Sequence, residues 1–190
     1  MKVAKVMLGS LMLAVAPLAA MADGMSYSYV DAGYAQTDID GVGPSADGFG
    51  LRGSVGFAQN WFAFADYSSQ SVQGIDLESI GVGLGGHYGL TDALDLVGRV
   101  GYFEVNLDAP GGISADDDGY SLDLGLRGRV TEGVELEGGV NYTDLSEGGD
   151  DTALFVGGRF HFNKTWAVGA EYASGDDSSS IIAYVRASFQ

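Results

Sequence analysis

The chain has 190 residues, including 31 glycines and no cysteine, and its 26 acidic side chains against 9 basic ones give a formal net charge of -17. The lack of cysteine excludes a disulfide scaffold, a thiolate metal site and a cysteine nucleophile. The acidic balance argues against nucleic-acid binding, which needs lysine and arginine at the phosphates. With 46% hydrophobic and 11% aromatic residues, the chain is too apolar to be disordered, so we expect it to fold.

The N-terminus has the three parts of a secretory signal peptide. Two lysines precede an apolar stretch over residues 6–18, and an Ala-Met-Ala cleavage site ends at Ala22. We expect residues 1–22 to be a cleaved signal peptide and the mature chain, beginning at Asp23, to be one domain over residues 23–190. The apolar stretch is shorter than the roughly 20 residues of a spanning helix, and no later apolar run is long enough. A mature chain that enters a bilayer must therefore cross it as strands.

The mature region alternates with a period of two residues, which is typical of β-strands. In residues 119–130, for example, Leu122 and Leu124 share one parity while Asp123 and Arg127 share the other. The same count along the chain predicts ten strands, near residues 25–36, 48–58, 61–70, 77–89, 94–105, 119–130, 134–144, 152–162, 166–174 and 181–189. Assigning the short ninth segment and one neighbour to a loop region leaves eight strands as the alternative.

Strand length and connection length both favour an all-β, transmembrane, antiparallel up-and-down β-barrel of the outer membrane. Most segments are near the 9 to 11 residues that a tilted strand needs to cross a bilayer, and short turns at one end oppose mostly longer loops at the other. Aromatic residues of the apolar face also form two belts, as at the two interfaces of membrane barrels. The expected extracellular belt contains Tyr34, Phe49, Tyr67, Tyr102, Tyr120, Tyr142 and Tyr172, and the periplasmic belt contains Phe57, Trp61, Tyr88, Phe162, Trp166 and Phe189.

The strand arginines give an independent test of which face meets lipid. All six have the parity of the barrel interior: Arg52, Arg99, Arg127, Arg129, Arg159 and Arg186. Placing them on the lipid face would cost roughly 12–24 kcal/mol as an upper bound, so the register is firmly specified. Carboxylates of the same parity can pair with them, namely Asp31, Asp66, Asp95, Asp123, Glu135, Glu137 and Glu171. We expect these residues to form a structural charge ladder that fills the lumen.

A narrow barrel filled in this way has little room for water. Besides the charges, Phe62, Phe64, Phe103 and Phe155 point inward, and barrels that are open as a rule have about 16 strands. Inward glycines nevertheless leave a narrow small-solute channel as an alternative function.

Acidic residues dominate the expected extracellular loops. They are Asp38, Asp40 and Asp47, Asp108 and residues 116–118, Glu147, Asp150 and Asp151, and Asp176 and Asp177. Oxygen-rich loops attract divalent cations, which could bridge to lipopolysaccharide phosphates. We favour a hydrated acidic surface without a defined metal site, because the calcium-loop spacing is absent. The expected surroundings are outer-membrane lipid and lipopolysaccharide, with the protein as a monomer and no nucleic-acid partner.

The sequence gives no pattern typical of an enzyme. His87 and His161 have interior parity at the periplasmic end, and neither converges with a serine and a carboxylate in a catalytic arrangement. We interpret both as hydrogen-bonded interior residues and expect no catalytic residue, bound metal or cofactor.

Residues 25–34, 46–50, 60–62 and 67–70 carry a family resemblance. With the sequences MSYSYVDAGY, ADGFG, NWF and YSSQ, they resemble a small outer-membrane β-barrel family described as a sulfation-dependent quorum factor, or elicitor, of plant-associated gammaproteobacteria. The resemblance implies an outer-membrane barrel with a cleaved signal, and it makes Tyr27 the counterpart of the tyrosine proposed for sulfation in the family's first motif. Our strand assignment places Tyr27 in the first strand, facing inward.

Two functions of different classes follow from these observations. The first is an integral outer-membrane barrel with a structural or surface-interaction role. The second, implied by the resemblance, is a secreted or vesicle-borne signalling or elicitor protein.

Overall fold

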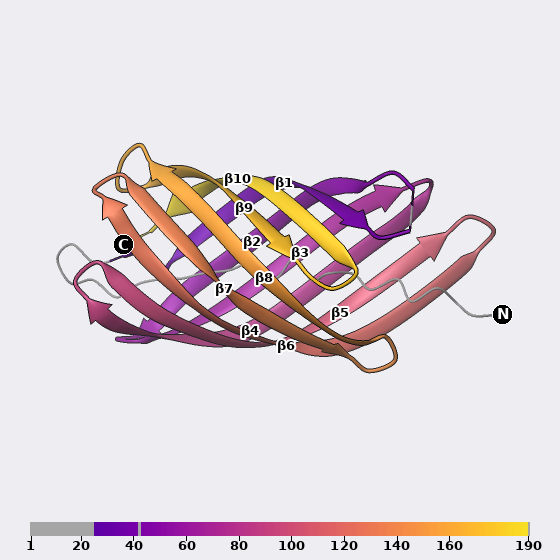
Figure 1. Ribbon diagram of the computed structural model, residues 1–190, viewed down its shortest axis with the longest axis horizontal. Coiled ribbons are helices and arrows are strands. Elements are labelled where there is room, and N and C mark those ends of the chain that lie inside the picture. The colour runs from indigo at the N-terminus through magenta and orange to yellow at the C-terminus, as the bar shows by residue number, and fades with distance from the viewer. Residues whose placement is uncertain (1–24, 42, 190) are drawn as a thin grey trace.

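The protein is a closed, antiparallel β-barrel of ten strands, seen here in a computed structural model that describes residues 25–41 and 43–189 (Figure 1). Each strand pairs with its neighbours in the chain, and β1 pairs with β10 to close the ring. The strands are β1 (Tyr29–Ile39), β2 (Ala46–Ala58), β3 (Trp61–Val72), β4 (Ile75–Thr91), β5 (Leu94–Ala109), β6 (Ile113–Thr131), β7 (Val134–Leu145), β8 (Gly149–His161), β9 (Trp166–Ser174) and β10 (Ser178–Ser188). The ten-strand prediction is confirmed, and the eight-strand alternative is wrong.

The expected signal peptide and its cleavage site between Ala22 and Asp23 lie outside the described residues. Within residues 25–41 and 43–189 we find no helix with the length and apolarity to cross a membrane.

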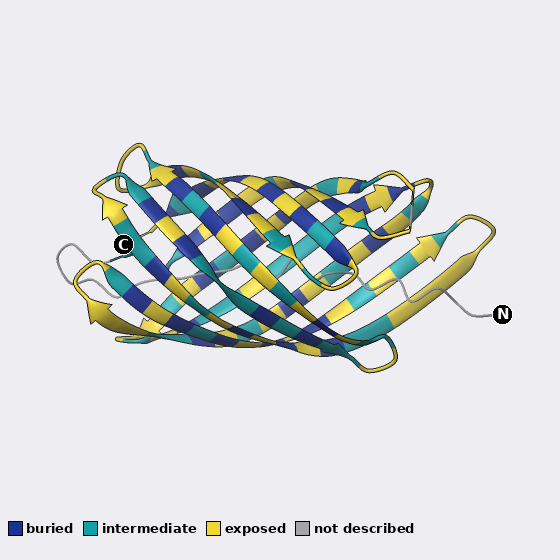
Figure 2. Cartoon of the chain, in the orientation of Figure 1, coloured by how far each residue is buried: buried dark blue, intermediate teal, exposed yellow. Residues whose placement is uncertain are grey.

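Burial alternates along the strands, so that buried and exposed residues form a chequered pattern over the barrel wall (Figure 2). On β6, Leu122 and Leu124 are 47% and 55% exposed, whereas Arg127 is only 2% exposed. This pattern is that of a sheet whose outer face is apolar and whose inner face carries the polar groups, as a bilayer requires.

Inward glycines on β4 make room for aromatic rings on β3. A Cβ atom at Gly85 would overlap the ring of Phe62, and one at Gly83 would overlap the ring of Phe64. Phe62 is completely buried as a result. Small residues opposite large ones let the interior of a small barrel be filled by side chains.

The prediction of long extracellular loops is wrong, because the strands continue through most of the residues assigned to them. The strand β5 has 16 residues and β6 has 19, and their hairpin extends furthest at the right-hand end of Figure 1. Between β3 and β4 the turn has only two residues, Gln73 and Gly74, both with positive φ (53° and 82°), as a tight hairpin turn requires. Outside the membrane a strand needs no apolar outer face, so the polar sequence gave no sign that pairing continues.

Several acidic residues assigned to loops therefore lie in strands. Asp38 and Asp47 are in β1 and β2, Asp108 is in β5, residues 116–118 are in β6, and Asp150 and Asp151 are in β8. Only Asp40, Glu147, Asp176 and Asp177 of that set are in connections. Asp151 faces inward and is 5% exposed.

The first strand begins at Tyr29 and not at residue 25. Tyr27 thus precedes β1, although it faces inward as expected and is 1% exposed.

Candidate functional site

The interior charges are concentrated in groups that join strands across the barrel wall. In the first group Asp31 of β1 accepts two hydrogen bonds from Arg186 of β10, from Nε to Oδ1 and from Nη2 to Oδ2, both at 2.7 Å. Arg52 of β2 approaches the same carboxylate at 3.6 Å. All three side chains are buried. This bidentate geometry is the strongest that arginine makes with a carboxylate, and it ties together the two strands that close the ring.

The second group lies on β6, β7 and β8. Arg127 donates to Glu135 Oε2 from Nε at 2.9 Å and from Nη2 at 2.5 Å. Arg159 approaches the same oxygen at 3.5 Å and lies 2.6 Å from Glu137. His161 Nε2 is 3.3 Å from the other oxygen of Glu135. The carboxylate of Glu135 on β7 thus contacts three cationic or protonatable groups, which lie on the two flanking strands β6 and β8.

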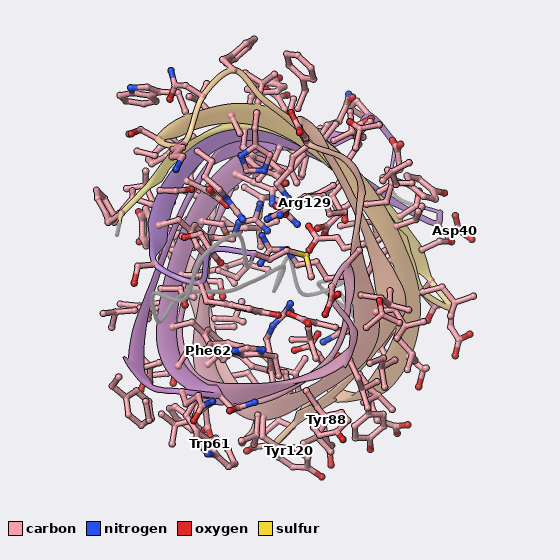
Figure 3. All side chains as sticks on the ribbon, turned by 90° about the vertical axis from the view of Figure 1, so that its left-hand side faces the viewer. Asp40, Trp61, Phe62, Tyr88, Tyr120 and Arg129 are labelled. Carbon is pink, nitrogen blue, oxygen red and sulfur yellow. The ribbon has the colours of Figure 1, made fainter. Side chains whose placement is uncertain are left out.

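The remaining members of the expected ladder lie on the same inner face. Asp123 accepts a hydrogen bond from Asn141 at 3.0 Å and stands opposite Arg99 in the β5–β6 pair, whereas Asp66 stands opposite Arg52 in the β2–β3 pair. Arg129 stands opposite Glu135, and Glu171, which is 4% exposed, stands opposite Gly157. Figure 3, which looks along the barrel, shows Arg129 and Phe62 inside the ring, and Trp61, Tyr88 and Tyr120 outside it.

Aromatic rings complete the environment of the arginines. The guanidinium carbon of Arg186 lies 3.6 Å from the centre of the Tyr29 ring, and that of Arg52 lies 5.0 Å from the Tyr184 ring. A cation held over an aromatic face is attracted by the ring quadrupole. These partners were not predicted from the sequence, because parity alone does not show which interior tyrosine lies at the height of which arginine.

A small cavity adjoins the second charge group. A cavity of about 10 Å³ lies between Val97, Arg99, Asp123, Arg127, Glu137 and Phe155. It has room for about one water molecule. Among residues 25–41 and 43–189 no three histidine, aspartate or glutamate side chains are placed to hold a metal ion together.

A further cluster surrounds Tyr27 at the mouth of the barrel that we expect to face the periplasm. Its hydroxyl donates a hydrogen bond to Asp95, its ring stacks on the imidazole of His87 at 3.9 Å between centroids, and Phe62 lies at 5.7 Å. His87 Nδ1 is 3.4 Å from Asp95. The two histidines are therefore interior residues beside carboxylates, as expected, whereas the expected hydrogen bonds of their rings stay a prediction.

Tyrosines of the extracellular belt donate hydrogen bonds to acidic residues on the same outer face. Tyr34 donates to Asp47 at 3.0 Å, Tyr67 to Glu78 at 2.9 Å, and Tyr120 to Asp144 at 2.7 Å. The rings of Tyr34 and Tyr120 are 57% and 45% exposed. Amphipathic rings below a band of carboxylates mark the boundary between the hydrocarbon and the aqueous exterior.

Comparison with known proteins agrees with this architecture. Residues 8–155 match the sequence profile of the outer membrane protein beta-barrel domain. The chain belongs to this family. Its location is therefore the outer membrane, with the barrel in lipid. Among curated proteins no sequence matches significantly.

Two solved porin structures show this fold at low identity. The KdgM porin has a TM-score of 0.50 at 13% identity, and the NanC porin has a TM-score of 0.51 at 10% identity. Each comparison covers 85% of this chain and 99% of the other. Neisserial surface protein A has 21% identity and a TM-score of 0.43, over 85% of this chain and 96% of that one.

Proposed function

We propose that this outer-membrane protein is a closed barrel with a structural or surface-interaction role, whose interior charges stabilise the scaffold and whose acidic rim faces the exterior. The observation that carries the proposal is the burial of the arginine and carboxylate groups against one another: Arg127, Arg159 and Arg186 are each 2% exposed. Guanidinium groups bound to carboxylates on neighbouring strands are poorly placed to line a water-filled pathway. The same contacts crosslink the wall from within.

The acidic rim, made of Asp47, Glu78 and Asp144, bears on how the outer surface interacts with the surrounding lipid. The carboxylates of Asp47, Glu78 and Asp144 lie on the outer face, directly above the tyrosine belt, at the level of lipid head groups. Neighbouring lipopolysaccharide phosphates would repel this band, so divalent cations shared diffusely between them would relieve the repulsion. The protein acts as a monomer in this proposal, because the closed ring leaves no strand edge for a second copy.

A narrow channel is the second candidate function, and the names of the two porins of similar fold favour it. Conductance of the purified protein in planar bilayers distinguishes a channel from a barrel with a non-conducting interior. We expect no stepwise conductance for the closed barrel, even at high protein concentration. Reproducible single-channel steps that disappear after heat denaturation would refute the proposal that the interior of the barrel does not conduct.

Fractionation of cells that produce the native protein tests the secreted alternative. We expect the protein to remain in the membrane pellet after carbonate and urea washing, and its gel mobility to change on boiling. Recovery of the folded protein from vesicle-free medium, without detergent, would instead support a secreted signalling or elicitor role. A periplasmic marker protein controls for cell lysis.

A further inference from the structure

The residues before β1 leave the barrel wall and enter its periplasmic mouth. Ser28 still follows the wall: its carbonyl accepts from the amide of Phe189 at 2.9 Å, and its hydroxyl accepts from the amide of Gly56 at 3.4 Å. The carbonyl of Ser26, two residues earlier, accepts from Arg127 Nη1 of β6 at 2.9 Å. In a ring of ten strands β6 lies five strands from β1 in either direction. The hydroxyl of Ser26 still donates to the carbonyl of Phe189 at 3.5 Å, so the segment before β1 is joined to both sides of the mouth.

Tyr27 is the centre of this segment. With Tyr29, Phe62 and Val97 it forms a cluster of buried apolar side chains, against which Met25 also packs. Its ring is stacked on His87 and lies 5.0 Å from the guanidinium carbon of Arg127. Its hydroxyl, bound to Asp95, is satisfied without water. Four strands, β3 to β6, thus each contribute a partner to this one side chain.

We propose that residues 25–28 form a strap that closes the periplasmic mouth of the barrel, with Tyr27 as its latch. The strap is held by side-chain contacts and one carbonyl contact across the mouth, not by a strand ladder, so it can open without breaking the barrel wall. Opening would expose the interior surface around Val97 to the periplasm. The proposal goes beyond the closed interior proposed above, because it concerns access to one end of the lumen and not passage through it.

Cysteine accessibility tests the strap directly, because the chain contains no cysteine of its own. The reporter is Val97→Cys, at an interior position that is 4% exposed and packs in the cluster of Tyr27. The control is Ala46→Cys, at an interior position 2% exposed on β2, which packs with Val72 and Leu77 near the other end of the barrel. Each is made in the mature protein with Tyr27 and with Tyr27→Ala. Labelling by a water-soluble maleimide is then timed in phospholipid nanodiscs.

We expect Tyr27→Ala to increase the labelling rate at Val97→Cys by about tenfold or more, because the strap loses its ring contacts and opens more often. The rate at Ala46→Cys should not change. Equal rates with and without Tyr27 at the reporter would overturn the proposal, and so would an equal acceleration at both positions, which would indicate general loosening.

A milder variant keeps the test decisive if Tyr27→Ala does not fold, as judged by gel mobility before boiling. Tyr27→Phe keeps the ring but removes the hydrogen bond to Asp95. We expect a smaller but measurable acceleration at Val97→Cys only, and an unchanged reporter rate in this folded variant would refute the latch. Bilayer conductance of the same variants stays a separate measurement, so a failure of the closed-interior proposal is distinguished from a failure of the strap.

Discussion

Replacing Asp31 with asparagine should lower the free energy of unfolding by about 3–5 kcal/mol, the cost of removing one partner from a buried ion pair. The carboxylate of Asp31 is bound by Arg186 through two hydrogen bonds and is approached by Arg52. Asparagine has nearly the same shape but no charge, so two guanidinium groups would remain buried without their shared counter-charge. The loss should be measured by urea titration of the refolded protein in phospholipid vesicles, following tryptophan fluorescence.

Asp47→Asn is the matched control for this prediction. It is the same substitution on the neighbouring strand, but Asp47 lies on the outer face at the exposed rim, where its carboxylate accepts a hydrogen bond from Tyr34. Water and salt screen a charge at such a position, so its removal should leave the unfolding midpoint nearly unchanged. If both variants lose the same stability, the charge group around Asp31 has no special role in holding β1 against β10.

The inner face of the barrel could be predicted from the sequence, because hydrocarbon imposes a sharp penalty on one parity. Arg52, Arg127 and Arg159 could face only the lumen, and the structure has all three buried. The same argument predicted the ten strands but not where they end, since pairing continues beyond the apolar alternation, as in β5 and β6. Alternation is informative here because the two sides of the wall meet such different surroundings.

The pairing of individual charges could not be predicted in the same way. Asp31 and Arg186 are 155 residues apart in the chain and meet only because β1 and β10 close the ring in one register. Parity gives the face of a residue but not its height along the barrel, which depends on the stagger between strands. The sharing of Glu135 by Arg127 and Arg159 depends on that stagger as well.

Tyr27 shows a second limit of the period-two pattern. Tyr27 and Tyr29 have the same parity, so alternation alone extends the strand back through both. The departure of the chain from the wall depends on partners on β4, β5 and β6, namely His87, Asp95 and Arg127, which are far away in the sequence. Tertiary contacts decide such a strand end. The burial of Tyr27, at 1% exposure, also means that a modifying enzyme could not reach its hydroxyl while the strap is closed.

Leu124→Arg should lower the free energy of unfolding by about 2–4 kcal/mol, because it puts a guanidinium on the lipid face near the bilayer midplane. Leu124 is 55% exposed on the outer face of β6, between Leu122 and Leu126. Its backbone partners are Gly98 on β5 and Val140 on β7, so the nearest neighbours offer no counter-charge. The folded fraction after refolding into vesicles, read from gel mobility without boiling, should fall accordingly.

Asp116→Arg is the matched control, with the same new residue on the same strand and of the same parity. Asp116 is exposed and lies eight residues from Leu124, past Tyr120 of the extracellular belt and in the part of β6 that pairs only with β5. A guanidinium there meets water and the acidic rim, so the folded fraction should match that of the unchanged protein. The new side chain and the strand are the same in both variants, and the change in net charge is larger at Asp116, so a greater loss at Leu124 reports its depth in the membrane. Equal losses at the two positions would mean that hydrocarbon does not surround Leu124, and the assignment of the outer face to lipid would have to be abandoned.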